Sequence, residues 1–325
     1  MSDRRLPPAR LEQLRRTFGS IEENVPLARY TAARIGGPAD VLLTAGSAER
    51  LAMIAETLWE LKLPFRILGG GSNVLVADAG IRGIVVLNQA RGVRFWESPE
   101  GPRLRAESGV GLGSVARRAV ERGWSGLEWA ATVPGTLGGA VVGNAGAHGG
   151  DIAGNLELAE ILQRRKGAES WPPERLEFAY RDSWLKRHPG EAVVLAATLR
   201  LRLSTVEETK AKMQEFSEQR RTTQPPGASM GSMFKNPPGD YAGRLIEACG
   251  LKGFRVGGAQ ISEVHANFFI NLGEATAADV KGLIDAARNR VAQQFDIELE
   301  LEVELLGDWQ TMESESAQLT NGGAL

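Results

Sequence analysis

The sequence predicts a globular protein of mixed α/β class with two or three domains. A chain of 325 residues with 42% hydrophobic content is long enough to bury several ordinary cores. Helical and strand-like patterns alternate over the first half, where an amphipathic stretch at 47–62 precedes short β-prone runs. We therefore expect helices and strands to pack together within each domain.

The composition excludes several classes of protein and site. No apolar run approaches the ~20 residues that span a membrane, and the N-terminus is too charged for a secretory signal, so we expect a cytoplasmic protein with no membrane partner. A single cysteine, Cys249, excludes an internal disulfide, and three scattered histidines give little support to a metal site. The net charge of −2 offers no footprint for nucleic acid.

The first half contains clear helix and strand patterns. Apolar residues recur at helical spacing after Ser47, a plausible N-cap, and a second helix is expected at 114–121, closed near Gly123. Strands are expected at 65–68, 74–76, 83–88 and 104–113.

Residues 69–73 (GGGSN) lie between two of these strands and predict a strand, glycine loop, strand arrangement. A Rossmann or phosphate loop needs a helix directly after the glycines, and VLVAD is a poor helix start. Successive amides can still form an anion-binding nest, to which Ser72 and Asn73 add donors suited to a pyrophosphate. A plain hairpin turn is the alternative interpretation.

A second glycine-rich segment, 135–150, carries seven glycines. This density is too high for a regular element, and the spacing is unlike a flexible linker, so we expect a structured loop against something flat or anionic. Because the two segments lie about sixty residues apart, they suggest one nucleotide-type cofactor held from two sides.

The second half begins with a charged helix at 205–219, which TTQPPGAS breaks, and we place a domain boundary near residue 204. Loops and strands are expected up to 271. A helix at 277–295 follows, with a capping box formed by Thr276 and Asp279. Its expected buried stripe comprises Val280, Ile284, Ala287, Val291 and Phe295.

Residues 297–305 (IELELEVEL) alternate strictly between apolar residues and glutamates and predict a half-buried strand. A solvated face is the ordinary interpretation of the glutamates. Periodicity alone selects none of them for a function. They are Glu298, Glu300, Glu302 and Glu304.

Seven motifs of this chain, in order, resemble those of a known family. They are ARIGGPAD (33–40), LGGGSNVLVAD (68–78), VPGTLGGAVVGNAGAHGGDI (133–152), YRDSWLK (180–186), GSMFKNP (231–237), GGAQISEVHANFFIN (257–271) and LEVELLG (301–307). Together they closely resemble the UDP-N-acetylenolpyruvoylglucosamine reductase (MurB) family of peptidoglycan precursor synthesis. The short spacings around GSMFKNP resemble the family's shorter variant, type II.

The resemblance implies a two-part FAD-binding domain of the vanillyl-alcohol-oxidase type and a smaller C-terminal α+β domain that binds substrate. On this basis the expected divisions are a helical extension at 1–24, FAD-binding subdomains at 25–95 and 96–204, a substrate-binding domain at 205–308 and a disordered tail at 309–325. The oligomeric state is left open.

The resemblance also implies the cofactor and the reaction. FAD is the expected cofactor, and NADPH and UDP-N-acetylglucosamine enolpyruvate are the expected small-molecule substrates. In this interpretation the amides of GGGSN hold the FAD pyrophosphate, and 133–150 passes along the flavin. The implied cofactor-binding residues are Gly69, Gly70, Gly71, Ser72, Asn73, Val133, Gly135, Thr136, Gly139, Asn144 and Gly146.

Three residues match the family's catalytic positions. Arg181 matches an arginine that stabilises the enolpyruvyl carboxylate, and Ser232 matches the proton donor. Glu302 matches the catalytic glutamate, and only this match selects it from its neighbours. The implied substrate-binding residues are Tyr180, Asn236, His265 and Arg221.

The chain departs from the family pattern at a few positions. His148 stands where tyrosine is common, Val264 replaces a frequent lysine, and Asp296 replaces a frequent glycine. RRTTQPP lacks the usual lysine toward the UDP diphosphate, and Arg221 is our substitute. Two other functions stay open at this point: another FAD-linked oxidase or dehydrogenase of the same fold, and a non-catalytic nucleotide-sugar-binding protein.

Overall fold

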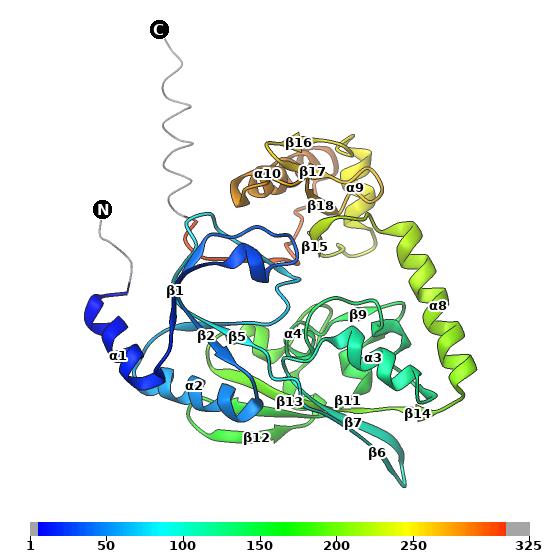
Figure 1. Ribbon diagram of the computed structural model, residues 1–325. Coiled ribbons are helices and arrows are strands. Elements are labelled where there is room, and N and C mark those ends of the chain that lie inside the picture. Colours follow the sequence, from blue (N-terminus) through cyan, green and yellow to red (C-terminus); the bar gives the residue numbers. More distant parts are fainter. Residues whose placement is uncertain (1–5, 310–325) are drawn as a thin grey trace. The chain divides into compact units, whose positions relative to one another are not determined.

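The computed structural model describes residues 6–309 (Figure 1). The described chain divides into two compact units. Of the described residues, unit 1 contains those at 6–42, 71–85 and 223–309, and unit 2 contains 43–70 and 86–222. Strands β2 (Pro38–Ala45) and β5 (Ile81–Asn88) each pass from one unit into the other. From residue 310 on, the expected tail lies outside the described residues.

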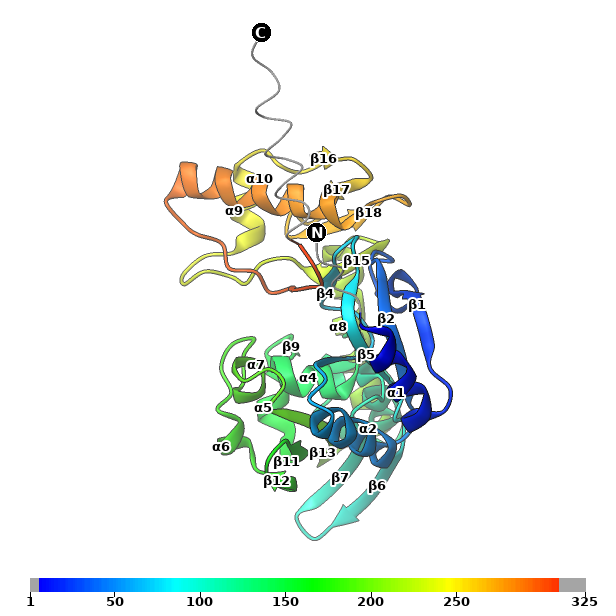
Figure 2. The ribbon, with the colours of Figure 1, turned by 90° about the vertical axis from the view of Figure 1, so that its left-hand side faces the viewer.

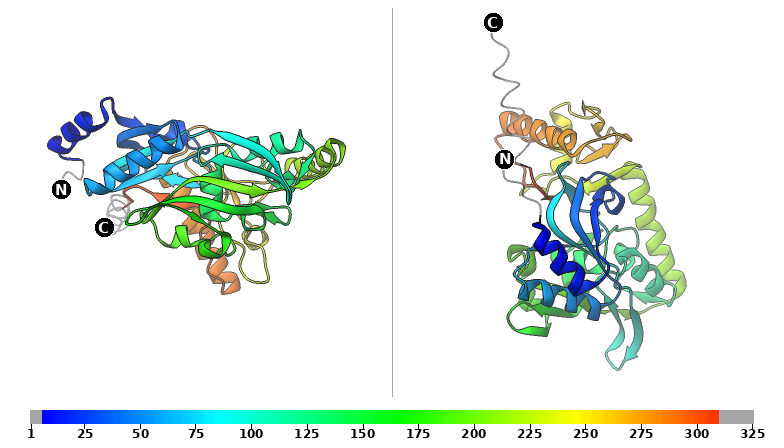
Figure 3. Two further views of the ribbon diagram at one scale, coloured as in Figure 1. Left: turned by 90° about the horizontal axis from the view of Figure 1, so that it is seen from below. Right: turned by 60° about the vertical axis from the view of Figure 1, so that its left-hand side comes forward.

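Unit 2 is built on a five-stranded antiparallel sheet with the strand order β12-β11-β13-β7-β6. The β6–β7 hairpin extends beyond the other strands of this sheet (Figure 3, cyan). The hydrophobic core of unit 2 includes Leu104, Ile161 and Trp171, all fully or nearly fully buried. The strands are β6 (Val93–Ser98), β7 (Gly101–Glu107), β11 (Leu156–Gln163), β12 (Gly167–Trp171) and β13 (Ala192–Arg200).

Helices and short strands complete unit 2. Helices α2 and α4 both pack against β13. The α-helices are α2 (Ala48–Glu60), α3 (Leu112–Val120), α4 (Leu137–Gly143), α5 (Ile152–Asn155), α6 (Pro173–Leu176), α7 (Trp184–Arg187) and α8 (Val206–Thr223), whose last residue belongs to unit 1. The remaining elements are β3 (Phe65–Leu68), β8 (Trp124–Ser125), η2 (Glu128–Ala130), β9 (Gly146–Ala147), β10 (Gly150–Asp151) and β14 (Arg202–Leu203).

Unit 1 contains a four-stranded antiparallel sheet in the order β15-β18-β17-β16. Helix α10 lies along this sheet beside α9 (Figure 2). Phe234, Phe269 and Ile284 are buried in the shared core. The elements are β15 (Ala228–Ser232), α9 (Ala242–Ala248), β16 (Arg255–Val256), β17 (Ala259–Ile261), β18 (Phe268–Asn271) and α10 (Ala277–Phe295).

The rest of unit 1 comes from the N-terminal part of the chain, the internal segment 71–85 and the last described residues. Strand β1 pairs antiparallel with β2, and β4 pairs parallel with β19. The latter pairing joins the strand that follows GGGSN to the last strand of the described chain. The elements are α1 (Pro8–Phe18), β1 (Glu22–Pro26), η1 (Leu27–Tyr30), β4 (Val74–Val76) and β19 (Glu304–Leu306).

Several elements predicted from the sequence are confirmed. The side chain of Ser47 caps α2, and Thr276 and Asp279 form the capping box of α10, which spans the predicted 277–295. The strand, glycine loop, strand arrangement around 69–73 is present as β3 and β4. No helix within residues 6–309 is long and apolar enough to cross a membrane.

The expectation that 135–150 contains no regular element is wrong. Helix α4 occupies 137–143, where Thr136 caps the first turn and Leu137, Ala140 and Val141 are buried at helical spacing. Glycine costs about 1 kcal/mol relative to alanine in a helix. Tertiary packing overrides this cost, because a Cβ at Gly138 would lie 2.8 Å from Ser108 Cβ.

The strand predicted at 297–305 is also wrong over most of its length, since only 304–306 form a strand. Alternating burial is present: Leu299 and Val303 are buried, and Glu298, Glu300 and Glu304 are exposed. Alternation predicts which side chains are buried, but a ladder needs a partner strand. Before Glu304, the segment makes irregular backbone hydrogen bonds to 233–235.

Candidate active site

The glycines of GGGSN allow close approach of backbone to backbone. An ideal Cβ at Gly69 would lie 2.3 Å from Thr136 Oγ1, and one at Gly70 would lie 3.0 Å from Gly135 Cα. The two glycine-rich segments therefore lie side by side in unit 2, as a shared ligand requires.

The other half of the turn belongs to unit 1. Gly71 has a φ of +58°, and a Cβ there would lie 2.0 Å from the carbonyl oxygen of Tyr30. The side-chain amide of Asn73 donates to the carbonyl oxygen of Glu302 over 3.1 Å. Asn73 thus connects the predicted cofactor loop to the segment that holds the predicted catalytic glutamate.

The turn also fits an anionic ligand. Within residues 6–309, the amide N–H groups of Gly70, Gly71 and Ser72 have no protein acceptor. Consecutive amides of this kind form an anion-binding concavity, and a Cβ on Gly70 or Gly71 would press against neighbouring backbone and shift these amides. This arrangement fits the pyrophosphate of FAD.

The candidates at 135–146 are part of helix α4 and its ends. Thr136 Oγ1 accepts the Gly139 N–H over 3.4 Å, so this hydroxyl caps the helix. Asn144 ends the helix in the left-handed region, and its side chain bonds to Ala153 N–H and to Ala179 O. These contacts give Thr136 and Asn144 a structural role in shaping the segment.

Arg181 is anchored to this segment. Its Nη2 donates to the carbonyl oxygen of Gly146 over 2.8 Å, and its backbone φ of +55° lies in the left-handed region. Lys186 Nζ donates to the carbonyl oxygen of Arg181 over 3.0 Å. The guanidinium carbon lies 5.4 Å from the ring centre of Tyr180, which is 54% exposed. Such contacts hold the backbone and the guanidinium in a defined orientation.

Ser232 and Glu302 are brought together within unit 1. Ser232 ends β15 and pairs with Phe268 in the sheet. The next carbonyl, that of Met233, accepts the Glu302 N–H over 2.9 Å, and Lys235 N–H donates to Glu300 O over 2.8 Å. The two predicted catalytic residues therefore lie on adjacent backbone segments. Lys235, three residues after Ser232, pairs with the Glu300 carboxylate over 2.6 Å.

Asn267 is a buried residue that the sequence reasoning missed. Its Oδ1 accepts the Phe234 N–H over 2.9 Å, and its Nδ2 donates to the Phe234 carbonyl over 2.8 Å. The Asn267 carbonyl also accepts the Met233 N–H. Asn267 thus positions the segment after Ser232. Its only sequence signal is a polar residue before the apolar run FFI.

The predicted substrate-binding residues have varied environments. Asn236 Oδ1 accepts the Ala242 N–H over 3.1 Å, at the start of α9. His265 Nδ1 lies 3.2 Å from the Asn267 N–H, and burial, aided by the charge of Lys252, lowers the pKa of this histidine below its ordinary value. Arg221 is exposed and pairs with Glu218 on the same helix over 2.7 Å.

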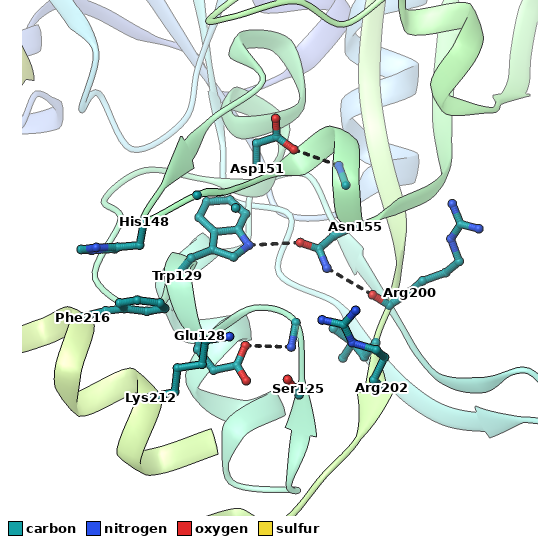
Figure 4. A pocket seen from close by; sticks show the side chains of 15 residues that line it. Ser125, Glu128, Trp129, His148, Asp151, Asn155, Arg200, Arg202, Lys212 and Phe216 are labelled. Carbon is teal, nitrogen blue, oxygen red and sulfur yellow. Dashed lines mark hydrogen bonds between the residues drawn. The ribbon is translucent and has the colours of Figure 1, made fainter. Parts of the chain in front are cut away.

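His148, where the family commonly has tyrosine, stacks on Phe216 of α8 (Figure 4). The ring centres are 4.4 Å apart with an interplanar angle of 11°. Nδ1 of His148 lies 3.1 Å from Gln219 Oε1. The imidazole is thus held against α8.

Two family models match segments of this chain. Residues 39–162 match a model described as FAD binding domain, and residues 222–306 match the UDP-N-acetylenolpyruvoylglucosamine reductase C-terminal domain. The UDP-N-acetylenolpyruvoylglucosamine reductase of Chloroflexus aggregans is 42% identical over 290 residues, which cover 88% of this chain and 98% of that protein. The chain belongs to the UDP-N-acetylenolpyruvoylglucosamine reductase family.

Further members of the reductase family are similar to this chain over most of its length. The reductase of Rubrobacter xylanophilus is 44% identical over 297 residues, covering 91% of this chain and 98% of that protein. The crystal structure of the reductase (MurB) from Thermus caldophilus shares 37% identity and a TM-score of 0.74, covering 88% of this chain and 99% of that one. The predicted fold class, an FAD-binding domain plus a smaller C-terminal domain of mixed helix and strand content, is confirmed.

Proposed function

We propose that this protein reduces UDP-N-acetylglucosamine enolpyruvate to UDP-N-acetylmuramate, with FAD as cofactor and NADPH as co-substrate. It is an oxidoreductase of peptidoglycan precursor synthesis and acts on small molecules. Family membership over nearly the whole length of its relatives supports the assignment. We place it in the cytoplasm and propose that the chain up to residue 308 divides, as predicted from the sequence, into an N-terminal extension ending at 24, FAD-binding subdomains at 25–95 and 96–204, and a substrate-binding domain at 205–308.

The observation that carries the proposal is the pairing of 233–235, directly after Ser232, with 300–303 in unit 1. It brings a hydroxyl, Ser232, and a carboxyl, Glu302, onto neighbouring backbone segments. A reduction across an enol ether needs a proton donor beside the carbon that becomes carbanion-like, and a positioned side chain contributes typically 10²–10⁴-fold to such a step. The alternative of a passive binding protein requires neither group.

When bound, FAD supplies a hydride carrier that accepts at N5 from NADPH and donates to the vinyl β-carbon of the substrate. The amides of Gly70, Gly71 and Ser72 would hold its pyrophosphate. Val133, Gly135 and the residues up to Gly146 would lie along the flavin and exclude water from it. The lack of a Cβ at the glycines permits this contact.

The chain's own residues would then handle charge and protons. Arg181 would bind the enolpyruvyl carboxylate, since a guanidinium fork matches a carboxylate bidentately and stabilises the charge that develops there. Ser232 Oγ would donate a proton to the α-carbon, and Glu302 would supply an ionisable group beside it. Tyr180, Asn236, His265 and Arg221 would contact the nucleotide sugar.

An anaerobic titration tests the proposal. NADPH should bleach the yellow of the purified holoenzyme, and adding the enolpyruvyl substrate should restore it with formation of UDP-N-acetylmuramate. A colourless protein, or a reduced flavin that reacts with oxygen but not with the enolpyruvyl substrate, would contradict the assignment.

A further inference from the structure

We propose that Asn271 is a positioning residue that fixes the strands carrying Ser232 relative to the cofactor turn GGGSN. This inference rests on the proposed function, because Ser232 is the proton donor assigned there. Asn271 is the last residue of β18, which pairs with β15, the strand that ends at Ser232. The connection to GGGSN runs through a turn at 31–35, whose last three residues open the motif ARIGGPAD.

The turn at 31–35 is closed by its own hydrogen bonds. The buried hydroxyl of Thr31 donates to the Ile35 carbonyl oxygen over 2.8 Å and accepts the Ile35 N–H over 3.2 Å. The Arg34 N–H donates to the Thr31 carbonyl oxygen over 3.1 Å. A hydroxyl that bonds nearby backbone groups stabilises a turn, so 31–35 has a defined conformation.

This turn bonds both the cofactor turn and the C-terminal sheet of unit 1. The Ala32 N–H donates to the Gly71 carbonyl oxygen over 2.9 Å. One residue later, the Ala33 carbonyl oxygen accepts a hydrogen bond from Asn271 Nδ2, also over 2.9 Å. Adjacent residues of one turn therefore connect the predicted FAD-binding loop to the end of β18.

Two further hydrogen bonds fix the direction in which the Asn271 amide points. Its Oδ1 accepts the Gly273 N–H over 2.8 Å and the Ala275 N–H over 3.0 Å. The amide oxygen thus faces the loop after β18, and the amide nitrogen faces Ala33. In the sheet, Asn271 pairs with Ala228 at one end of β15, and Phe268 pairs with Ser232 at the other end. A shift of β18 at Asn271 would therefore move the strand that pairs with Ser232.

Apolar packing alone does not set this orientation. Ala33 and Leu75 belong to the same buried cluster as Phe234 and Phe269, so the segments are pressed together. The hydrophobic effect is non-directional, whereas a hydrogen bond has a preferred distance and angle. A displacement of about 1 Å at a reacting group can cost about 10²-fold in rate. The Asn271 bond to Ala33 supplies the directional restraint on β18.

Asp78 provides a second link from the same part of unit 1. Its carboxylate oxygens accept the Ala277 N–H over 2.8 Å and the Ala278 N–H over 2.9 Å, at the start of α10. This link restrains the helix rather than β18. Loss of the Asn271 bond should therefore displace the strand without detaching the C-terminal sheet.

The test compares three variants as purified holoenzymes. Asn271→Asp keeps the shape and the Oδ1 acceptor but places an oxygen, in place of the donor, opposite the Ala33 carbonyl. Asn271→Ser removes the long donor without adding charge, and keeps the test available if the first variant does not fold. Thr276→Ala is the matched control, because it removes another side-chain hydrogen bond of the same domain, to the Asp279 N–H of its own helix.

Anaerobic stopped-flow measures flavin reoxidation at saturating enolpyruvyl substrate. At pH 8 the limiting rate should fall at least about 10-fold in both Asn271 variants, because the proton donor is displaced. Flavin occupancy should stay at the parental level, and Thr276→Ala should retain the parental limiting rate.

The pH dependence separates positioning from simple destabilisation. In Asn271→Asp the introduced carboxylate faces the Ala33 carbonyl oxygen, which raises the pKa of that carboxyl above its ordinary value. Once protonated, the carboxyl donates to the Ala33 oxygen and restores the bond. The ratio of variant rate to parent rate should therefore rise as the pH falls from 8 to 5.5, whereas the ratio for Asn271→Ser should stay constant.

Hydrogen exchange followed by mass spectrometry gives a readout that needs no substrate. The peptide that covers 31–35 should exchange faster in Asn271→Asp than in the parent, while the peptide that covers α10 keeps its parental protection. A parental limiting rate in both Asn271 variants, equal slowing by Thr276→Ala, or a rate ratio of Asn271→Asp that is independent of pH would each overturn the positioning role.

The two proposals fail separately. If the parent holoenzyme does not reduce the enolpyruvyl substrate, the proposed function falls, while exchange at 31–35 still decides whether Asn271 holds the turn. If the parent reduces the substrate and both Asn271 variants do so at the parental limiting rate, the function stands and Asn271 is not a positioning residue.

Discussion

The backbone N–H of Glu302 donates to the carbonyl oxygen of Met233 over 2.9 Å, one residue after Ser232. This bond joins segments about seventy residues apart in the chain. Asn73 adds a second link by donating to the Glu302 carbonyl over 3.1 Å. The backbone at Glu302 is therefore held from both sides by segments that carry other predicted site residues.

Substituting Gly70→Val should lower FAD occupancy. The ideal Cβ lies 3.0 Å from Gly135 Cα, so a valine forces the two glycine-rich segments apart and displaces the amide nest. The flavin-to-protein absorbance ratio of the purified variant measures occupancy. Gly46→Val is the control, because nothing lies within 4 Å of its added Cβ. Full occupancy in the Gly70 variant would remove this loop from the FAD site.

Local patterns in the sequence predicted elements whose signals are themselves local. Helix α10 begins at a capping box and buries Val280, Ile284, Ala287 and Val291, with Phe295 partly buried. Its stripe and its cap depend on spacing along one segment, which is readable without knowing its neighbours. The same reasoning predicted α2 and the glycine turn.

Features that depend on distant partners could not be predicted this way. Helix α4 contains glycines at 138, 139 and 143, and its close packing against Ser108 appears only in the folded chain. Residues 297–303 alternate as a strand does but find no strand to pair with. The catalytic candidates were selected by family motifs, because no periodicity separates Glu302 from the neighbouring glutamates. The bonds of Asn267 to Phe234 required coordinates.

Arg181→Lys should keep FAD and its reduction by NADPH but slow reoxidation by the enolpyruvyl substrate by at least about 10-fold. A lysine replaces a bidentate fork with a point charge. Anaerobic stopped-flow traces of the two half-reactions measure this. Arg175→Lys, which alters an ion pair with Glu169 outside the site, should leave both rates unchanged. Equal slowing of both half-reactions by Arg181→Lys would assign Arg181 to the flavin or the fold.

Asn267→Ala should destabilise unit 1 by roughly 2–4 kcal/mol, because two hydrogen bonds to the Phe234 backbone are lost and buried polar groups are left unsatisfied. Urea denaturation measures the change. Asn267→Asp keeps the acceptor for the Phe234 N–H but loses the donor to the Phe234 carbonyl. Its loss of unfolding free energy should therefore differ from that of Asn267→Ala. If Asn267→Ala has parental stability and a parental rate of substrate reduction, this residue does not position the Ser232 segment.

His265 should make the protein less stable as the pH falls below about 6.5. Burial lowers the pKa of His265 in the folded state, so the unfolded chain takes up the proton first and acidification favours unfolding. Well above pH 6.5 the histidine is neutral in both states and contributes no pH dependence. His265→Gln should flatten this part of the stability profile, measured as free energy of unfolding from pH 7.5 to 5.0. Identical slopes in parent and variant would contradict the shift.

Ser232→Ala should separate the two half-reactions most clearly. Hydride addition at the β-carbon leaves a carbanion-like α-carbon that must be protonated from one face, and removing the hydroxyl removes the proposed donor. Flavin reduction by NADPH should be nearly unchanged, whereas reoxidation by the enolpyruvyl substrate should fall by at least ~10²-fold, the lower end of general acid contributions. Ser232→Cys should recover part of the rate, because a thiol can also donate a proton. Ser229→Ala, in the same strand, is the matched control and should retain both rates. If Ser232→Ala turns over within a few-fold of the parent, another group or a water is the acid, and the serine serves only to shape the end of β15.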